Sequence, residues 1–234
     1  MKAKNIEIVN EIPKSYKEHF IGQGCSGRCY LIKENNLVFK ELYNDRLPIE
    51  EMNYFTYIDN DTFSFPRTMI YKDGKIIGYL CKYIEGTSFD KLSGNEDIYD
   101  FLNATDKLEK EIKNLSEEGI ELFDIKYNHA IYTKDKEIKL IDTDLYYYKL
   151  EEPYYLFRAS LKEWGNFLMT YLQSDYPFQN DYLNELYLRL VFDGKVKPTH
   201  ILDLMLQEMN KKTDYKIQTL GEFKEGQKLI KKLY

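Results

Sequence analysis

Residues 20–40 read FIGQGCSGRCYLIKENNLVFK and contain a glycine cluster, 22–27, that fits the pattern G-x-G-x-x-G. Two apolar runs, 29–32 and 37–39, follow the cluster and are separated by the polar turn 33–36, which is typical of a β-hairpin. A dinucleotide-binding turn would need a helix directly after the glycines, so that phosphate lies at the helix N-terminus. The stretch therefore predicts a glycine loop between two strands. Phosphate binding by its backbone and an ordinary hairpin turn rich in glycine both remain open.

The rest of the chain divides into a β-rich first half and an α-rich second half, with a predicted boundary near Glu85. A second hairpin is expected over 67–71 and 75–83, around the turn Lys72-Asp73-Gly74. Helices are expected over 48–58, 98–118 (with Gly119 as its C-terminal stop) and 160–172, and short strands over 130–133 and 137–141. The predicted fold class is α+β, with two lobes over residues 1–84 and 85–234.

Composition and charge narrow the functional class of this 234-residue chain. Its net charge is −6 and its basic residues are interspersed with acidic ones, which argues against a nucleic-acid partner. Three cysteines are too few for a disulfide framework. No stretch approaches the roughly 20 apolar residues of a membrane helix, and residues 1–10 show no signal-peptide pattern. We therefore expect a cytoplasmic protein with reduced thiols and no membrane partner.

A second motif begins at residue 119 with GIELFDIKYNHAIY and continues at residue 138 with IKLIDTD. An aspartate, Asp124, is followed two residues later by Lys126, and two short strands then lead to Asp142 after an apolar pair. This order resembles the catalytic loop and the metal-binding loop of the protein-kinase superfamily. Together with the glycine loop, the resemblance covers about residues 20–144. It implies a bilobal kinase-like fold that binds ATP and Mg²⁺ in a cleft between its lobes.

The resemblance assigns catalytic roles to particular residues. Asp124 would accept the proton of the acceptor hydroxyl, and Lys126 would face the γ-phosphate. Lys40 would pair with the α- and β-phosphates and be held by a glutamate of the next helix, Glu51, or alternatively Glu50. Asp142 would hold Mg²⁺, and Asp144 is a second oxygen ligand that could share this work.

The resemblance also assigns the nucleotide-binding residues. Gly22, Gly24 and Gly27 would allow the loop backbone to approach the phosphates. The backbone of the hinge, 82–84, would bind adenine, with Cys81 as the gatekeeper residue. The predicted nucleotide-binding residues are thus Gly22, Gly24, Gly27, Cys29, Val38, Lys40, Lys82 and Ile84.

Several positions depart from the family pattern. His129 stands where the family has a metal-binding asparagine, and Asn128 lies one residue early, so either side chain is a candidate ligand. Leu122-Phe123 replaces the family's His-Arg, and Thr143-Asp144 replaces its Phe-Gly. No Ala-Pro-Glu follows the metal loop, and Ser160 replaces the aspartate of the central helix. These departures lie at the second metal position and on the acceptor side of the site.

Three functions remain as hypotheses. Lys126 favours a Ser/Thr protein kinase, because small-molecule kinases of the aminoglycoside and choline type usually lack that lysine. The short segment after Asp144 and its Asp-x-Asp pattern favour such a small-molecule kinase instead. The substitution at His129 favours a nucleotide-binding pseudokinase that acts as a scaffold or switch. The expected partners are ATP and a hydroxyl acceptor, either a protein or a small molecule.

Overall fold

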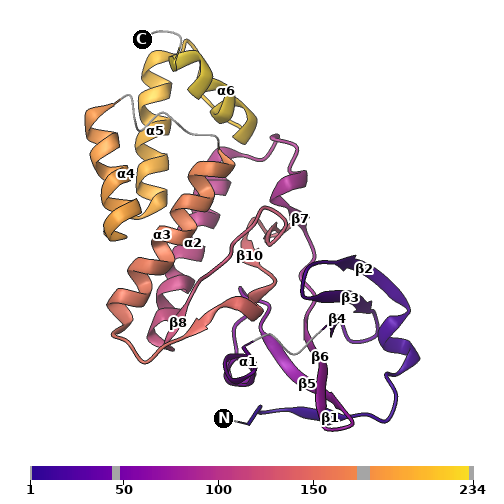
Figure 1. Cartoon of the computed structure of the whole chain (residues 1–234). Coiled ribbons are helices and arrows are strands. Elements are labelled where there is room, and N and C mark those ends of the chain that lie inside the picture. Colours follow the sequence, from indigo (N-terminus) through magenta and orange to yellow (C-terminus); the bar gives the residue numbers. More distant parts are fainter. Residues whose placement is uncertain (1, 44–47, 173–179, 232–234) are drawn as a thin grey trace. The chain divides into compact units, whose positions relative to one another are not determined.

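The structure is a computed structural model that describes residues 2–43, 48–172 and 180–231. Helices hold 43% of the residues and strands 23%, so the α+β class is confirmed. The chain separates into two compact units, one made of 1–85 with 139–148 and the other of 86–138 with 149–234 (Figure 1). The first crossing lies at the predicted boundary, Glu85. Residues 139–148, which we expected in the second half, belong to the first unit and bring Asp142 and Asp144 into it.

The first unit is built on a sheet with the strand order β1-β5-β6-β4-β3-β2. Its strands are β1 (Ile6–Ile8), β2 (His19–Gln23), β3 (Gly27–Ile32), β4 (Leu37–Leu42), β5 (Pro66–Lys72) and β6 (Lys75–Lys82). Both predicted hairpins are present, because β3 pairs with β4 and β5 with β6 in antiparallel register. Asp73 and Gly74 turn the second hairpin with φ values of 51° and 75°. Such left-handed pairs match the twist of the flanking strands.

Helix α1 (Ile49–Phe55) closes one face of this sheet and is shorter than the predicted 48–58. Its fully buried Met52 packs with Met69 and Tyr79 of the sheet. Short 3₁₀ helices at Lys14–Lys17 and Thr143–Leu145 and strand β11 (Tyr147–Tyr148) complete the unit. The ring of Tyr148 stacks on that of Tyr54 in α1 with centroids 3.8 Å apart. This contact holds the end of the 139–148 segment against the helix.

The second unit is mainly helical. Its helices are α2 (Ile98–Glu117), α3 (Pro153–Tyr171), α4 (Asp181–Asp193), α5 (Pro198–Lys212) and α6 (Leu220–Lys231). Its short elements are β7 (Thr87–Ser88), a 3₁₀ turn (Phe89–Lys91), β8 (Ile120–Glu121) and β9 (Ala130–Tyr132), and β10 (Ile138–Leu140) lies where the chain passes into the first unit. Strand β7 pairs with β9 in antiparallel register.

Helix α2 matches its prediction at both ends. Asp97 accepts the backbone N–H groups of Tyr99 and Asp100 at its start, and Gly119 has a φ of 80° just past its end. Helix α3, which runs beside α2 in Figure 1, begins at Pro153 rather than at the predicted 160. The first three residues of α3, 153–155, are exposed and Leu156 is its first buried side chain, so the buried face begins one turn after the start of the helix.

The core of the second unit contains aromatic and methionine side chains. Trp164, Met205 and Met209 are fully buried. Gly165 lets α4 approach α3, because a Cβ there would lie 2.5 Å from the side chain of Leu190. No helix in the described ranges combines the length and apolarity that crossing a bilayer requires.

One buried carboxylate in this unit belongs to neither motif. Glu109 of α2 has no exposed surface, and its Oε1 accepts the backbone N–H of Thr199 at 2.8 Å and the Thr199 hydroxyl at 2.6 Å. Glu109 therefore provides a hydrogen-bond acceptor at the N-terminus of α5, where backbone N–H groups have no partner within the helix. Burial raises the pKa of Glu109 to about 7, against the opposing effects of Thr199 and Lys197.

Replacing Glu109 by glutamine should change the pH dependence of stability. In the native protein Glu109 keeps a proton that the unfolded chain releases, so between pH 4.5 and about 7 the wild type loses stability as pH rises. The amide keeps an oxygen for Thr199 and cannot ionise. We expect Glu109→Gln to gain about 2–3 kcal/mol relative to the wild type between pH 5 and pH 8, measured by urea unfolding. Parallel pH profiles of the two proteins would contradict this.

Candidate functional site

The first unit brings Lys40, Asp142 and Asp144 together although they lie about a hundred residues apart in sequence. Lys40 projects from β4 and is 5% exposed. Its Nζ lies 2.8 Å from Oδ2 of Asp144 and also forms an ion pair with Asp142. The structure does not pair Lys40 with the predicted Glu51 or with the alternative Glu50, because both ion pairs of Lys40 among the described residues are with the aspartates. Asp144 is 1% exposed and needs a counterion more than a glutamate at the start of α1 does.

The charges of this cluster are unbalanced, with one ammonium facing two carboxylates. Burial lowers the pKa of Lys40, but Asp144 and Asp142 outweigh it and hold this pKa above its ordinary value. Burial, together with the charge of Asp142, raises the pKa of Asp144 despite the nearby ammonium. The cluster therefore has excess negative charge to offer a further cation.

The two motif aspartates share an uncommon backbone conformation. Asp124 has a φ of 59° and Asp142 a φ of 61°. The other non-glycine residues with positive φ in the described chain are Asn36, Asp73 and Lys136, and each turns a hairpin. Asp124 and Asp142 do not, and such conformations outside turns concentrate at functional sites.

Hydrogen bonds to Ser64 hold the Asp142 loop in place. The Ser64 backbone N–H donates to the carbonyl of Leu140 at 2.9 Å, and the Thr143 hydroxyl donates to the Ser64 carbonyl at 3.1 Å. Leu140 and Thr143 are both buried. These contacts on either side of Asp142 fix its left-handed backbone and so direct its side chain to Lys40.

The three predicted glycines differ in what constrains them. A Cβ added to Gly27 would lie 2.2 Å from the Glu41 carbonyl oxygen, so strand packing alone requires glycine there. A Cβ on Gly22 or Gly24 would meet no atom within 4 Å. The Gly24 N–H closes the loop by donating to the Gly27 carbonyl at 3.0 Å. The backbone at Gly22 and Gly24 is thus open to a ligand.

The predicted adenine-contacting side chains lie on the same sheet face as Lys40. Val38 and Cys81 are cross-strand partners within one buried cluster, and Cys29 packs against it and pairs with Lys40. Burial raises the pKa of Cys29 to about 11, partly offset by Lys40, so its thiol stays protonated. These small side chains leave the face beside Lys40 apolar.

The two hinge residues that are predicted to bind the nucleotide, Lys82 and Ile84, differ in their hydrogen bonding. The Lys82 side chain pairs with Asp61, and its carbonyl accepts the Ser64 hydroxyl at 2.6 Å. Ile84 forms no backbone hydrogen bond with the described residues. Unpaired backbone groups normally find another partner such as water or ligand. Ile84 is therefore the better candidate for adenine recognition.

In the second unit, Asp124 lies at the start of a loop that is stabilised by contacts between Asp124 and the residues that follow it. Lys126 Nζ is 2.7 Å from Asp124 Oδ2, and Nδ1 of His129 is 3.0 Å from the Asp124 carbonyl oxygen. His129 is buried at 6% exposure, whereas Asn128 is exposed. The structure thus gives His129 a positioning role that the metal-ligand prediction did not include.

Helix α3 holds both sides of Asp124 through side chains that sequence reasoning missed. Ser160 Oγ accepts the backbone N–H of Leu122 at 3.0 Å, and Glu163 Oε1 accepts that of Ile125 at 3.3 Å. Ser160, which first stood out as a departure from the family pattern, therefore supports the loop. The sequence signal that could have identified these two residues is their i, i+3 spacing, which places two hydrogen-bond acceptors on one face of the helix.

The described residues contain no group of three or more His, Cys, Asp and Glu side chains that could hold a metal by themselves. Mg²⁺ usually binds through one or two carboxylates together with the phosphates of its substrate. The oxygens of Asp142 and Asp144, with their excess negative charge, suit that mode. A fit to Mg²⁺ therefore depends on a nucleotide being present.

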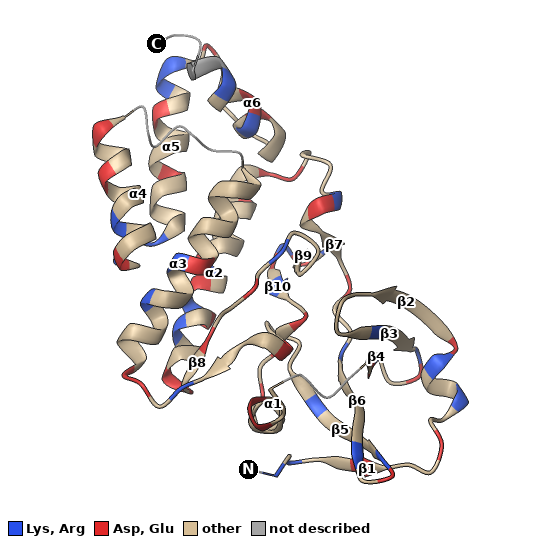
Figure 2. Ribbon diagram, viewed as in Figure 1, with Lys and Arg blue, Asp and Glu red and all other residues tan. Residues whose placement is uncertain are grey.

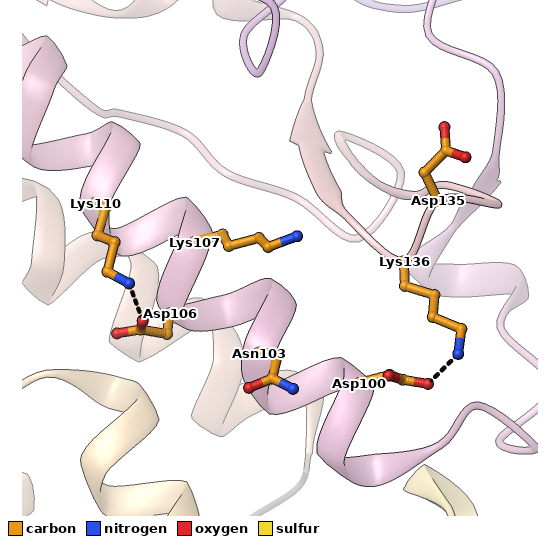
Figure 3. Close-up of a pocket in the computed structure, with 7 residues that line it drawn as sticks. All are labelled: Asp100, Asn103, Asp106, Lys107, Lys110, Asp135 and Lys136. Atoms are coloured by element: carbon orange, nitrogen blue, oxygen red, sulfur yellow. Dashed lines mark ion pairs between the residues drawn. The ribbon is translucent and has the colours of Figure 1, made fainter.

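A pocket elsewhere in the second unit contains none of the predicted site residues. It lies between α2 and the turn before β10 and is lined by Asp100, Asn103, Asp106, Lys107, Lys110, Asp135 and Lys136 (Figure 3). Its lysines already have partners, since Lys136 pairs with Asp100 and Lys110 with Asp106, each at 2.6 Å. Helices α4, α5 and α6 each carry both acidic and basic residues (Figure 2). Neither feature indicates a particular ligand.

Comparison of the chain with protein-family models and with curated proteins finds no match.

Proposed function

We propose that this protein is an ATP- and Mg²⁺-dependent phosphotransferase of the protein-kinase-like type, and that it phosphorylates Ser or Thr hydroxyls of proteins. The observation that carries the proposal is the cluster in which the buried Lys40 faces the buried Asp144 and the partly exposed Asp142. A cation for phosphates and two carboxylates for Mg²⁺ are the groups that phosphoryl transfer needs, because its catalysis is mostly positioning and charge neutralisation.

The proposed chemistry uses the residues as follows. Lys40 neutralises the α- and β-phosphates, and Asp142 with Asp144 holds Mg²⁺, which neutralises charge on the phosphates. Asp124 takes the proton of the acceptor hydroxyl as its oxygen bonds to the γ-phosphorus and ADP departs. Lys126, already paired with Asp124, supplies positive charge to the transferred group. His129, Ser160 and Glu163 keep the loop of Asp124 in position.

One observation favours a small-molecule acceptor as the second candidate. Helix α3 begins at Pro153, so only residues 145–152 connect Asp144 to it. Protein kinases of the family pattern use a longer segment here to dock peptides, which this chain lacks. A small hydroxyl compound would need no such segment. The pseudokinase alternative predicts nucleotide binding without transfer.

Thermal unfolding with ATP, with and without Mg²⁺, tests the proposal. A ligand at about 100 times its Kd stabilises the native state by about 2.7 kcal/mol, and we expect a stabilisation of this order that needs Mg²⁺. Asp142→Asn should abolish the Mg²⁺ dependence, since it removes a carboxylate ligand. Asp73→Asn, the same change at a left-handed hairpin position, serves as control. No shift with ATP in either condition would refute nucleotide binding, and a shift without transfer would favour the pseudokinase.

A further inference from the structure

Lys224 of α6 is a half-buried cation that forms no ion pair with the described residues. Its Nζ lies 3.6 Å from the ring centroid of Tyr171 in α3. Burial lowers the pKa of Lys224, and the charge of Glu96 opposes this only in part. The oxygens of Glu96 are occupied, because they accept hydrogen bonds from Ser93 and Gly94. The ring face of Tyr171 replaces part of the hydration that the Lys224 ammonium loses on burial, and a bound anion would replace the rest.

The position of Lys224 is set by a firm anchor at the start of α6. Backbone N–H groups of Leu220 and Gly221 donate to the carbonyls of Glu96 and Gly94 at 2.8 and 2.7 Å. Thr219 and Glu222 form a capping box, in which the Glu222 N–H donates to the Thr219 hydroxyl and Glu222 Oε2 accepts the Thr219 N–H. Lys224 follows about one turn later, so its backbone is held in place, and its ammonium lies over the ring of Tyr171.

Aromatic contacts connect this cation to the loop of Asp124. The ring centroids of Tyr171 and Tyr127 are 5.6 Å apart, and Tyr127 also lies 5.6 Å from Phe167. Tyr127 belongs to the loop, directly after Lys126, and is 38% exposed. The Tyr171 hydroxyl has no hydrogen bond to the described part of the chain. Burial and the charge of Glu96 raise the pKa of Tyr171, so this hydroxyl remains a donor.

We propose that Lys224, Tyr171 and Tyr127 form a subsite for a negatively charged group, a carboxylate or a phosphate, on the hydroxyl acceptor. The inference rests on the proposed function, because that function makes the loop of Asp124 the place where the acceptor hydroxyl is activated. Lys224 supplies a positive charge to the bound anion, and the Tyr171 hydroxyl donates a hydrogen bond to it. Tyr127 contributes an exposed ring within the loop of Asp124. The acceptor is then an acidic peptide or a small hydroxyl compound that carries an acid group.

Amine labelling tests the anion site without ATP. The full chain is treated with trinitrobenzenesulfonate at pH 7.5, and modification of each lysine is followed by peptide mass spectrometry. Inorganic phosphate and glycerol 3-phosphate, which carry no amine that could react with the reagent, are the probes, and glycerol is the neutral control. At about twice its Kd an anion should slow labelling of Lys224 about threefold, whereas glycerol should not. Lys228, exposed on the same helix and paired with Glu225, is the control lysine. Equal labelling of Lys224 under all conditions would overturn the proposal.

A transfer assay then separates the two sources of the anion. One arm compares serine peptides with acidic or neutral flanking residues, and the other compares hydroxy acids with neutral alcohols. We expect that, in one of the two arms, the anionic acceptors are phosphorylated faster than the neutral ones. Lys224→Met should raise the KM of that acceptor about tenfold, and Lys224→Arg should restore most of it. Equal use of anionic and neutral acceptors would overturn the subsite. Absence of any transfer, with protection of Lys224 intact, would count against the proposed function alone.

Discussion

Replacing Lys40 by methionine should lower the free energy of unfolding by about 3–5 kcal/mol at pH 7.5, because it leaves Asp144 as an uncompensated buried charge. Asp144 is 1% exposed and its only described counterion is Lys40, at 2.8 Å. The loss should shrink toward pH 5, since the already raised pKa of Asp144 would rise further and the carboxyl would take a proton. Urea unfolding at several pH values measures both effects.

Two variants make this result specific to the ion pair. Lys75→Met changes an exposed lysine of the same sheet and should stay within about 0.5 kcal/mol of the wild type. Adding Asp144→Asn to Lys40→Met removes the stranded charge and should recover much of the stability. If Lys40→Met behaves like Lys75→Met, the buried cluster does not form as described.

The second large effect is expected for Asp124→Asn, which should reduce phosphate transfer about 10²–10⁴-fold, the range typical of a lost general base. The amide has nearly the same shape but cannot accept the proton. Stability should hardly change, because asparagine tolerates the left-handed conformation and His129 binds the unaltered carbonyl. The ion pair with Lys126 is partly exposed and contributes little to stability.

The Asp124→Asn variant should therefore lose transfer activity while keeping its stability. Transfer is measured with labelled ATP, and the melting temperature is measured on the same preparation. Asp73→Asn makes the same substitution at a φ of 51° in a hairpin turn and should change neither quantity. Full transfer activity in Asp124→Asn would show that another group accepts the proton, and a large drop in melting temperature would assign Asp124 a structural role instead.

Much of the local structure follows from short-range patterns. Apolar runs on either side of the turns 33–36 and 72–74 predict both hairpins, and Gly119 marks the end of α2. The motif that contains Asp124, Lys126 and Asp142 includes two aspartates, Asp124 and Asp142, that have positive φ outside hairpin turns. These signals act over a few residues, where turn chemistry, capping and periodicity operate. The start of α3 escapes them because its first three residues, 153–155, are exposed.

The partners of the functional groups could not be read from such patterns. Lys40 pairs with aspartates 102 and 104 residues away instead of the nearer Glu51, because Asp144 is buried and must be neutralised. His129 fastens the Asp124 loop through a backbone carbonyl. Lys224 meets Tyr171 because backbone hydrogen bonds near Gly94 anchor α6. The sequence thus specifies which chemical groups are available and the elements that carry them. Burial and long-range packing select the pairs, since they determine which charges lose water and need a counterion.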